Sequence, residues 1–447
     1  MAIATASTGN RFKVLNFLFV LSLLLASFDI ALDFEIGGVS IRGAQLAQLL
    51  FVSLYFFTPS NDSRNARFNA PLGFKWLLIW GGFLTIWTPH TYHLSFSVGY
   101  TLFFMFSVTI IFVAVQVYRD SSDRVVALFR TYIISFVLIA LFGLAQFVGG
   151  LFGYDLLVTQ WWRQGVLPRL NGFSFEPSYY ATYLITGWGM LAWLVDRKVY
   201  IFRRPVLFAY FGIVSLAIFL SSSRMAILIM AAYLIYYFIK EIGYIVFRFQ
   251  LRTGFLKVVA LLTLTTIGVV AMIVVTVGFD SLRFLLFGTG IAGSADHSSA
   301  MRLGQFKDTI DLFVQSPIIG YGLGGLWSYI SMMHGIDLSE ATGMNVTAEV
   351  LAASGIFGFI FYVLYLWANI RGSFRHLDRR FPVTELLAAA GMGFLLLYLI
   401  LQFNQSIMRV YFWNHLAVLA VIFDCVRQRA AQPLKQRPPL NRRSMPA

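Results

Sequence analysis

The sequence is poor in charged residues and has almost no cysteine. Charged residues occupy 12% of its 447 positions, whereas soluble domains carry roughly 25%. Because 58% of the residues are hydrophobic, we expect a polytopic membrane protein rather than two or three soluble domains. Cys425 is the single cysteine, which excludes disulfides and cysteine-ligated metal sites within one chain.

We expect the first apolar run to be a retained span rather than a cleavable secretory signal, because no A-x-A-like site follows it. A helix needs about 20 apolar residues to cross the roughly 30 Å of hydrocarbon in a bilayer. Twelve runs approach that length, which predicts an all-α polytopic fold of about twelve transmembrane helices. The runs are 14–32, 41–57, 72–88, 94–117, 131–150, 178–195, 205–221, 225–247, 256–277, 346–369, 383–403 and 411–426.

Lysine and arginine are distributed unequally between the two sides that these runs define. When the loops are assigned to alternate sides, 26 of the 34 basic residues fall on one side and 8 on the other. Cytoplasmic loops carry the excess of positive charge in membrane proteins. We therefore expect both termini in the cytoplasm, and this placement explains the net charge of +14 without a nucleic-acid partner.

The predicted organisation is one transmembrane domain, 1–429, followed by a disordered cytoplasmic tail, 430–447, near anionic lipid headgroups. Two long loops, 151–177 and 278–345, are expected on the outer side. The second is the only long polar interval of the sequence, and we expect it to be partly helical and to lie between the ninth and tenth spans.

Arg224 is a basic residue on the side that should be poor in them. It lies at the junction of the runs 205–221 and 225–247, with apolar sequence on both flanks. A charge near hydrocarbon is costly and is by default a functional candidate. The alternative is that its side chain simply reaches the lipid headgroups, as long basic side chains do.

Arg302 is a second such residue. The apolar spacing predicts an amphipathic helix over 301–315, ended by Ser316 and Pro317. Arg302 would lie in its first turn, where the helix dipole disfavours cations, so an anion bound between the guanidinium and the free backbone N–H groups is the functional interpretation. The alternative is a surface arginine paired with Asp296 or Asp308.

Glu176 and His334 are candidate general bases in the two outer loops. Either could instead be a solvated surface residue. Trp161 is a candidate for stacking on sugars, although tryptophan is common at membrane interfaces. His90 and His93 have a spacing compatible with a metal site, but the sequence shows no third ligand.

The glycine-rich segment Gly320–Gly325 resembles a nucleotide loop only superficially. It lacks the Lys-Ser/Thr pair of a Walker motif and the strand of a dinucleotide-binding fold. We interpret it as a tight backbone turn.

Taken together, four motifs resemble the bacterial O-antigen ligase and O-antigen/exopolysaccharide polymerase superfamily. Ser221-Ser222-Ser223-Arg224 is similar to its Ser-x-Ser-Arg signature, and Arg302 with Pro317–Gly324 is similar to its "R … PxxGxGxG" loop. Asn345 with Ser354–Gly358 resembles its "N … xGIxG" span. Asn171–Ser178 resembles a stretch that is common among polysaccharide polymerases.

The resemblance implies a glycosyltransferase of the bacterial inner (cytoplasmic) membrane that uses a glycan on undecaprenyl pyrophosphate at the periplasmic face, without a cofactor. In the ligase branch a histidine precedes the asparagine that matches Asn345. Met344 occupies that position here, which favours the polymerase branch. A chain-length regulator is a further candidate partner, besides membrane lipids.

The expected chemistry is compatible with the residues. Arg224 and Arg302 would clamp the pyrophosphate and stabilise the leaving group, in place of a metal, for which the sequence shows no carboxylate cluster. Glu176 or His334 would take the proton of the acceptor hydroxyl. Further candidates for substrate binding are Arg163, Arg169, Asn345, Tyr321 and Trp161.

Two other functions remain open. A ligase would transfer the same donor to a lipid A core. A flippase or exporter of lipid-linked sugars should carry ionisable residues in its spans along a central path, and Glu349 is the clearest candidate for such a residue. A peptidoglycan polymerase also has a long outer loop, but its motifs are absent from the sequence.

Overall fold

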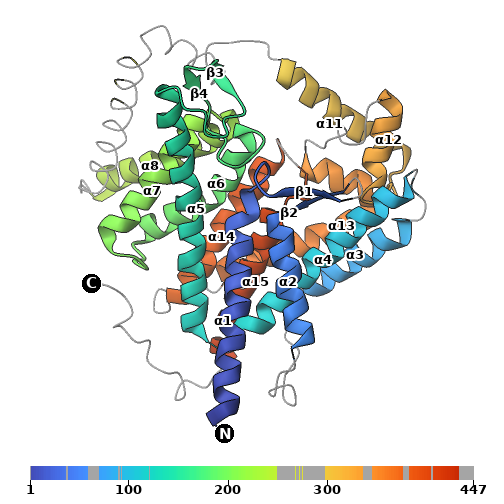
Figure 1. The fold of residues 1–447 in the computed structure, drawn as a ribbon, viewed down its shortest axis with the longest axis horizontal. Coiled ribbons are helices and arrows are strands. Elements are labelled where there is room, and N and C mark those ends of the chain that lie inside the picture. Colours follow the sequence, from blue (N-terminus) through green and yellow to red (C-terminus); the bar gives the residue numbers. More distant parts are fainter. Residues whose placement is uncertain are drawn as a thin grey trace. The chain divides into compact units, whose positions relative to one another are not determined.

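The computed structural model describes residues 2–36, 39–58, 70–88, 91, 93–119, 121–248, 267, 271, 274, 297–335, 345–375, 382–403 and 406–431. The described part holds thirteen α-helices and two short hairpins (Figure 1). The helices are α1 (Ala2–Leu24), α2 (Gly43–Phe57), α3 (Phe74–Trp87), α4 (Leu94–Tyr118), α5 (Ser122–Leu151), α6 (Pro177–Arg197), α7 (Arg204–Ser221), α8 (Arg224–Arg248), α11 (His297–Gln315), α12 (Gly325–His334), α13 (Val346–Arg375), α14 (Pro382–Leu401) and α15 (Val410–Ala431). The antiparallel hairpins pair β1 (Asp33–Ile36) with β2 (Val39–Arg42), and β3 (Trp161–Arg163) with β4 (Leu167–Pro168).

The predicted all-α class is confirmed. Eight helices of the described part are long and apolar enough to cross a membrane: α1, α4, α5, α7, α8, α13, α14 and α15. The protein is therefore a multi-pass membrane protein. Every predicted run overlaps a helix except 256–277, of which the structure describes only residues 267, 271 and 274. With α2 and α3 only 15 and 14 residues long, the number of twelve spans stays a prediction.

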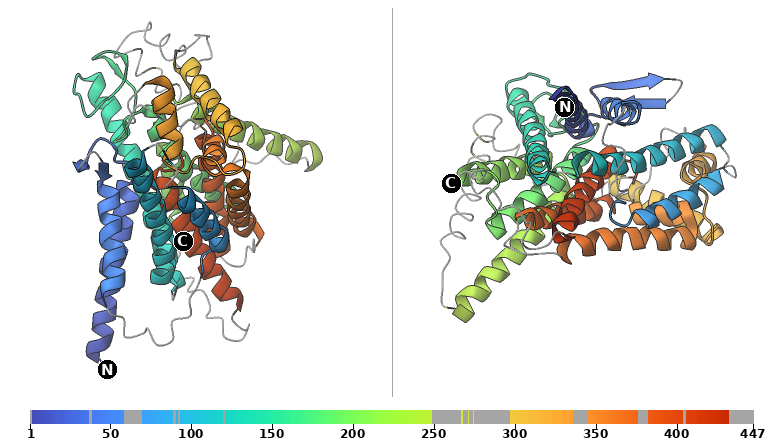
Figure 2. Two further views of the ribbon diagram at one scale, coloured as in Figure 1. Left: turned by 90° about the vertical axis from the view of Figure 1, so that its right-hand side faces the viewer. Right: turned by 90° about the horizontal axis from the view of Figure 1, so that it is seen from below.

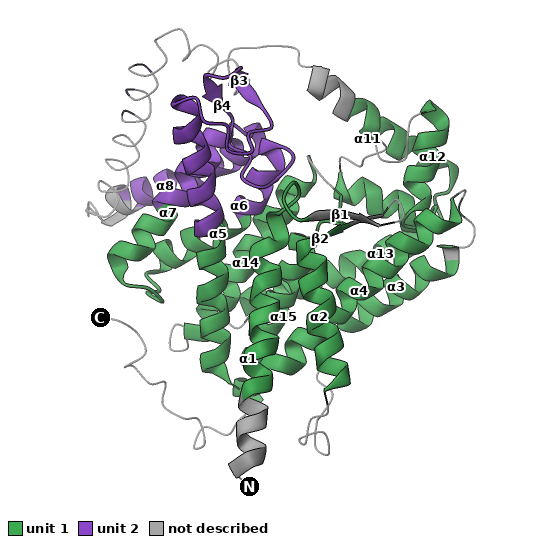
Figure 3. Cartoon of the chain, viewed as in Figure 1, with its two compact units in different colours: residues 1–136, 186–211, 296–447 green, residues 137–185, 212–295 purple. Residues whose placement is uncertain are grey.

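The chain divides into two compact units, coloured separately in Figure 3. Unit 1 comprises 1–136, 186–211 and 296–447, and unit 2 comprises 137–185 and 212–295. Helices α5, α6 and α7 contribute residues to both units. The predicted tail 430–447 overlaps the end of α15 at Ala430 and Ala431, and the rest of it lies outside the described residues.

Helix α15 forms the centre of unit 1. Of the residues in its most apolar 18-residue stretch, 94% are buried. The helix packs against α4, α13 and α14. The amide of Asn414 on α15 joins it to two further helices, because its Oδ1 accepts from Gln48 Nε2 at 2.6 Å and its Nδ2 donates to the Ser22 carbonyl at 3.0 Å. Such interhelical hydrogen bonds hold helices together where hydrophobic burial drives little association. The helices it joins, α1 and α2, run side by side (Figure 2).

The break between α7 and α8 is a feature of unit 2. Helix α7 ends at Ser221 and α8 begins at Arg224. Ser222 between them has a left-handed backbone with φ of 54°, which a helix interior does not contain. The interpretation of 205–221 and 225–247 as two helices is therefore confirmed.

Candidate functional site

The turn before α8 presents Arg224 at a helix start. Ser221, Ser222 and Ser223 are all buried, whereas the Arg224 side chain is exposed. Ser221 Oγ donates to the Ile218 carbonyl at 2.6 Å, which closes the end of α7. Arg224 is the first residue of α8, whose first turn contains no acidic residue. A guanidinium and the free N–H groups of a helix start both attract anions, so this turn is suited to a phosphate group.

Two buried amides shape the loop 151–177 of unit 2. Gln146 on α5 donates to the Gly172 carbonyl at 2.9 Å and accepts from the Gly172 N–H at 2.8 Å. Asn171 donates to the carbonyls of Leu157 and Ser174 at 3.0 and 2.9 Å. These side-chain bonds satisfy backbone N–H and C=O groups of the loop that are not paired within a helix or sheet. The stretch that begins at Asn171 therefore organises the loop from inside.

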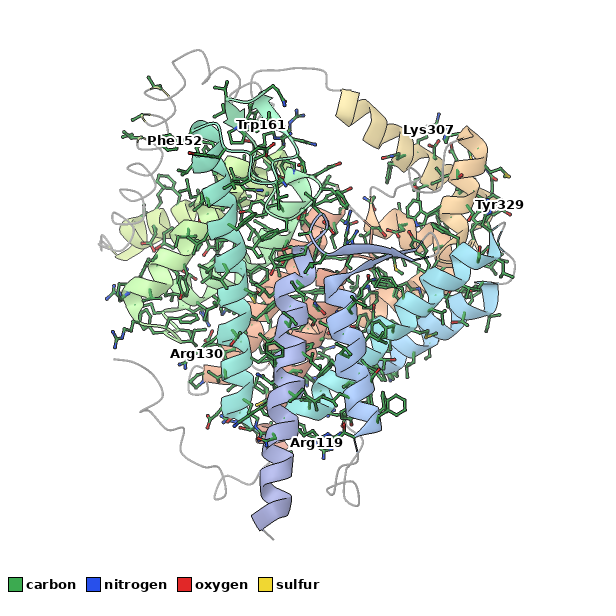
Figure 4. The ribbon with its side chains drawn as sticks, in the orientation of Figure 1. Arg119, Arg130, Phe152, Trp161, Lys307 and Tyr329 are labelled. Atoms are coloured by element: carbon green, nitrogen blue, oxygen red, sulfur yellow. The ribbon has the colours of Figure 1, made fainter. Side chains whose placement is uncertain are left out.

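Three of the residues predicted to bind substrate lie on the β3–β4 hairpin or beside it. Trp161 is on β3 and is partly buried (Figure 4). Arg169 follows β4, donates to Gln160 Oε1 at 2.9 Å, and places its guanidinium 4.7 Å from the centre of the Trp162 ring. Arg163 lies on β3, and its side chain is outside the described residues. The structure thus places Trp161 and Arg163 on this hairpin and Arg169 directly after it.

Glu176 is at the start of α6, immediately before Pro177. Its carbonyl accepts from the Tyr179 and Tyr180 N–H groups at 3.0 and 3.2 Å. Its carboxylate accepts from Ser178 Oγ at 2.8 Å. A carboxylate at a helix start is favoured by the dipole, so a helix-capping role accounts for these contacts.

The helix that carries Arg302 starts earlier than the sequence predicts. Helix α11 begins at His297 instead of 301, which places Arg302 in the second turn rather than the first. The dipole argument for an anion beside Arg302 is therefore wrong, because the effect is confined to the first turn. The prediction failed because 297–300 has no apolar period to mark it as helical. The side chain of Arg302 is outside the described residues, whereas the predicted end at Ser316 is confirmed.

His334 forms a pair with Asp308. His334 is the last residue of α12, and its Nε2 lies 2.8 Å from Asp308 Oδ2 on α11. The His334 side chain is 46% exposed and that of Asp308 is 21% exposed. A carboxylate bonded to one ring nitrogen fixes the orientation of an imidazole. From the sequence, Asp308 was expected only as a possible partner of Arg302.

Tyr321 lies in the segment between α11 and α12. Its ring centre is 4.4 Å from that of Tyr329, and its hydroxyl donates to Gln315 Oε1 at 3.4 Å. Burial, and to a lesser extent Tyr329, raises the pKa of the Tyr321 hydroxyl, which therefore stays protonated as a donor. Both rings are partly buried against a cluster that includes Leu312 and Trp327.

The glycine-rich segment is a tight turn, as predicted, and it forms backbone hydrogen bonds with α13. Gly320 and Gly322 have φ of 70° and 77°. The Tyr321 and Gly322 N–H groups donate to the carbonyls of Ala352 and Ala353 at 3.1 and 2.8 Å. Those carbonyls are accessible because α13 is interrupted at Gly355, whose φ and ψ are 59° and −171°. The loop and the span, which the sequence presents as separate motifs, thus form one structure.

Asn345 caps the start of α13. Its Oδ1 accepts from the Ala348 N–H at 2.8 Å, and its Nδ2 donates to the Gln402 carbonyl at 2.8 Å. A side-chain oxygen that accepts from the third residue of a helix is the usual capping arrangement. The contacts of Asn345 are those of a residue that positions α13, and Met344 is outside the described residues.

Asp29, Arg42 and Arg409 form a buried charged cluster in unit 1 that was not predicted from the sequence. Asp29 is 2% exposed, and its Oδ1 lies 2.5 Å from Arg42 and 3.5 Å from Arg409. Glu349 is also buried and accepts from Ser406 Oγ at 2.7 Å and from the Ile407 N–H at 3.1 Å. The available signal was that Arg42 and Arg409 are two of the eight basic residues on the basic-poor side.

Replacing Asp29 with alanine is expected to destabilise the protein by about 3 kcal/mol, because two largely buried guanidinium groups lose their shared carboxylate. The midpoint of thermal unfolding in detergent measures this loss. Asp311→Ala, at an exposed carboxylate on α11, is the matched control and should leave the midpoint unchanged. Equal midpoints for both variants would show that the cluster contributes nothing to stability.

Of the two histidines considered for a metal, His93 is exposed and His90 is outside the described residues. The described part of the chain contains no group of three or more His, Cys, Asp or Glu side chains that could hold a metal ion.

The predicted site residues thus fall into two groups, one in each unit. A search of the curated proteins finds no match. The comparison with protein families does find one, over a segment that holds Arg224, Arg302, His334 and Gly355, and it supports the predicted resemblance at the level of the family. Residues 209–363 match the family described as O-antigen ligase (Wzy_C).

Proposed function

We propose that this protein is a periplasmic-face glycosyltransferase that polymerises repeat units linked to undecaprenyl pyrophosphate. In each step an acceptor hydroxyl attacks the anomeric carbon of the donor glycan. The new glycosidic bond forms as the bond from that carbon to the pyrophosphate oxygen breaks. The lipid pyrophosphate leaves with the bonding electrons, and a base on the protein takes the acceptor proton. Inversion at the anomeric carbon is expected.

The observation that carries the proposal is the placement of Arg224. It is exposed at the first residue of α8, within the segment that matches the O-antigen ligase family. An arginine at that position offers a fork of N–H donors to a phosphate. Charge develops on the pyrophosphate as the bond breaks, so a fixed donor there lowers the barrier. A role for Arg302 in binding the pyrophosphate stays a prediction from the sequence.

His334 is the better candidate for the base. Its imidazole is exposed and bonded through Nε2 to Asp308, which leaves Nδ1 on the other side of the ring for an acceptor hydroxyl. The Glu176 carboxylate, by contrast, already accepts from Ser178 at the start of α6. General-base catalysis needs a group that can reach the proton to be transferred.

Replacing His334 with alanine is expected to lower the transfer rate by a factor of about 10²–10⁴. Asp308→Asn, which keeps a hydrogen-bond acceptor but removes the charge, should have a smaller effect in the same direction. The rate of chain growth from a lipid-linked repeat unit is the measurement. His93→Ala, at another exposed histidine of unit 1, is the control. Full activity of His334→Ala would show that another group is the base. Glu176→Gln would then be the next variant to test.

The ligase is the second candidate, because the matched family is described as O-antigen ligase. Complementation of a strain that lacks the protein separates the two functions. A polymerase defect leaves single repeat units on the cell surface and removes long chains. A ligase defect removes all surface glycan while full-length chains accumulate on the lipid carrier. We expect the first result.

The transporter alternative has less support. Glu349, the proposed mid-span ionisable residue, is buried and holds the segment 406–407 through two hydrogen bonds. A carboxylate used in this way fixes α13 in unit 1.

A further inference from the structure

The facing sides of α11 and α12, together with Tyr321 in the segment between them, carry a row of polar and aromatic side chains. Asp308 and Gln315 lie on α11, on either side of the buried Leu312. Asp308 is bonded to His334, and Gln315 accepts from Tyr321. Tyr329 lies on α12 and contacts Tyr321 ring to ring. Figure 4 shows Tyr329 on α12 and Lys307 on the neighbouring α11.

The spacing of these residues gives the row a defined length. Positions 308, 312 and 315 are four and three residues apart, which places them on one face of α11. At 1.5 Å per residue the row extends for about 10 Å along the helix. The His334–Asp308 pair stands at one end of it, and the Tyr321–Gln315 pair stands at the other.

One side of each tyrosine ring packs against buried residues, and the rings are not fully enclosed. Tyr321 and Tyr329 pack against the buried cluster of Leu312, Leu326 and Trp327. Both rings nevertheless remain partly exposed. A partly exposed aromatic ring with a fixed position and a polar end offers contact area at a low cost in side-chain entropy.

A pyranose ring presents both surfaces that such a row can recognise. Its C–H face packs on aromatic rings, and its hydroxyl groups pair with carboxylate, amide and imidazole groups, which supply acceptors and donors at fixed positions. A lipid chain would make no use of Asp308, Gln315 or His334. A phosphate would be repelled by Asp308, which leaves a neutral sugar as the best-matched ligand.

We propose that Tyr321, Tyr329, Gln315 and Asp308 form a subsite for the acceptor sugars. The His334–Asp308 pair lies at the end of this subsite where the reacting hydroxyl of the acceptor binds. The assignment to the acceptor rests on the proposed function, because the base takes its proton from the acceptor and not from the donor. The subsite then holds the end of the acceptor glycan with its hydroxyl beside His334.

Binding of the free repeat-unit oligosaccharide, released from the host's surface polysaccharide and carrying no lipid or phosphate, tests the subsite directly. Saturation-transfer NMR with the full-length protein in detergent detects it without any reaction. Tyr329→Ala and Tyr321→Ala should each weaken binding by about tenfold. Tyr329→Phe keeps the ring and should stay within a factor of about three. Tyr236→Ala, at an exposed tyrosine of α8, is the matched control.

Each result has one meaning. Wild-type binding by both alanine variants, with the proteins shown to be folded by their thermal midpoints, would overturn the subsite. Weakened binding in the alanine variants, together with normal binding by Arg224→Ala, would support it. If the wild-type protein binds the oligosaccharide through these tyrosines but joins no repeat units, the subsite stands and the polymerase proposal fails. If it joins repeat units but the tyrosine variants do so with an unchanged KM for the acceptor, the polymerase proposal stands and the subsite fails.

Discussion

Replacing Arg224 with alanine is expected to lower the rate of glycan transfer by a factor of about 10²–10³, the usual effect of removing one donor that stabilises charge in a transition state. The side chain is exposed at the first residue of α8, so its removal should cost little stability. Arg224→Lys should recover only part of the activity, because an ammonium cannot offer the planar fork of N–H groups that pairs with two phosphate oxygens. Growth of glycan on a lipid-linked repeat unit by the purified variants gives the rates.

Arg204 provides an unusually close control for this variant. It is also an exposed arginine at the first residue of a helix, α7, but it lies on the side predicted to be cytoplasmic. Arg204→Ala should therefore transfer glycan at the wild-type rate. Equal activity of the Arg224→Ala and Arg204→Ala variants would contradict the phosphate role. Arg224 would then matter no more to the reaction than an exposed arginine at the start of another helix.

Replacing Gly355 with alanine is expected to abolish the packing of the glycine-rich loop on α13. The φ of 59° at this position is costly for any residue with a side chain. A Cβ there would also lie 2.3 Å from the Ile318 carbonyl oxygen. Since that obstacle is backbone, the loop and the span must separate for the methyl group to fit. We expect a loss of at least about 3 kcal/mol of stability from strain and overpacking together.

Thermal unfolding in detergent and the yield of monodisperse protein measure this effect. Gly82→Ala is the control, because Gly82 lies inside α3 and a Cβ there would meet nothing within 4 Å. Alanine is favoured over glycine in helix interiors, so this variant should be neutral or slightly stabilised. A wild-type midpoint for Gly355→Ala would show that the interruption of α13 is dispensable.

The parts of the fold that follow from local sequence were predictable. Apolar run length predicts the spanning helices, and the Ser-Ser-Ser-Arg sequence predicts that α7 and α8 are separate, as the left-handed Ser222 shows. The glycine-rich segment could be interpreted as a turn, because glycine readily adopts the positive φ that Gly320 has.

Contacts between distant segments were not predictable in the same way. His334 and Asp308 are 26 residues apart, and no periodicity in the sequence relates them. Asp29, Arg42 and Arg409 come from the two ends of the chain. Such pairs depend on how the helices pack, which one sequence does not specify.

A reaction with one substrate and the purified protein tests the central proposal most directly. The protein in lipid nanodiscs would receive undecaprenyl pyrophosphate carrying one repeat unit, with a chelator present and no nucleotide. We expect a ladder of longer glycans, with one undecaprenyl pyrophosphate released for each new linkage. The absence of a ladder, with transfer of the glycan only after a lipid A core acceptor is added, would contradict the polymerase proposal and identify a ligase.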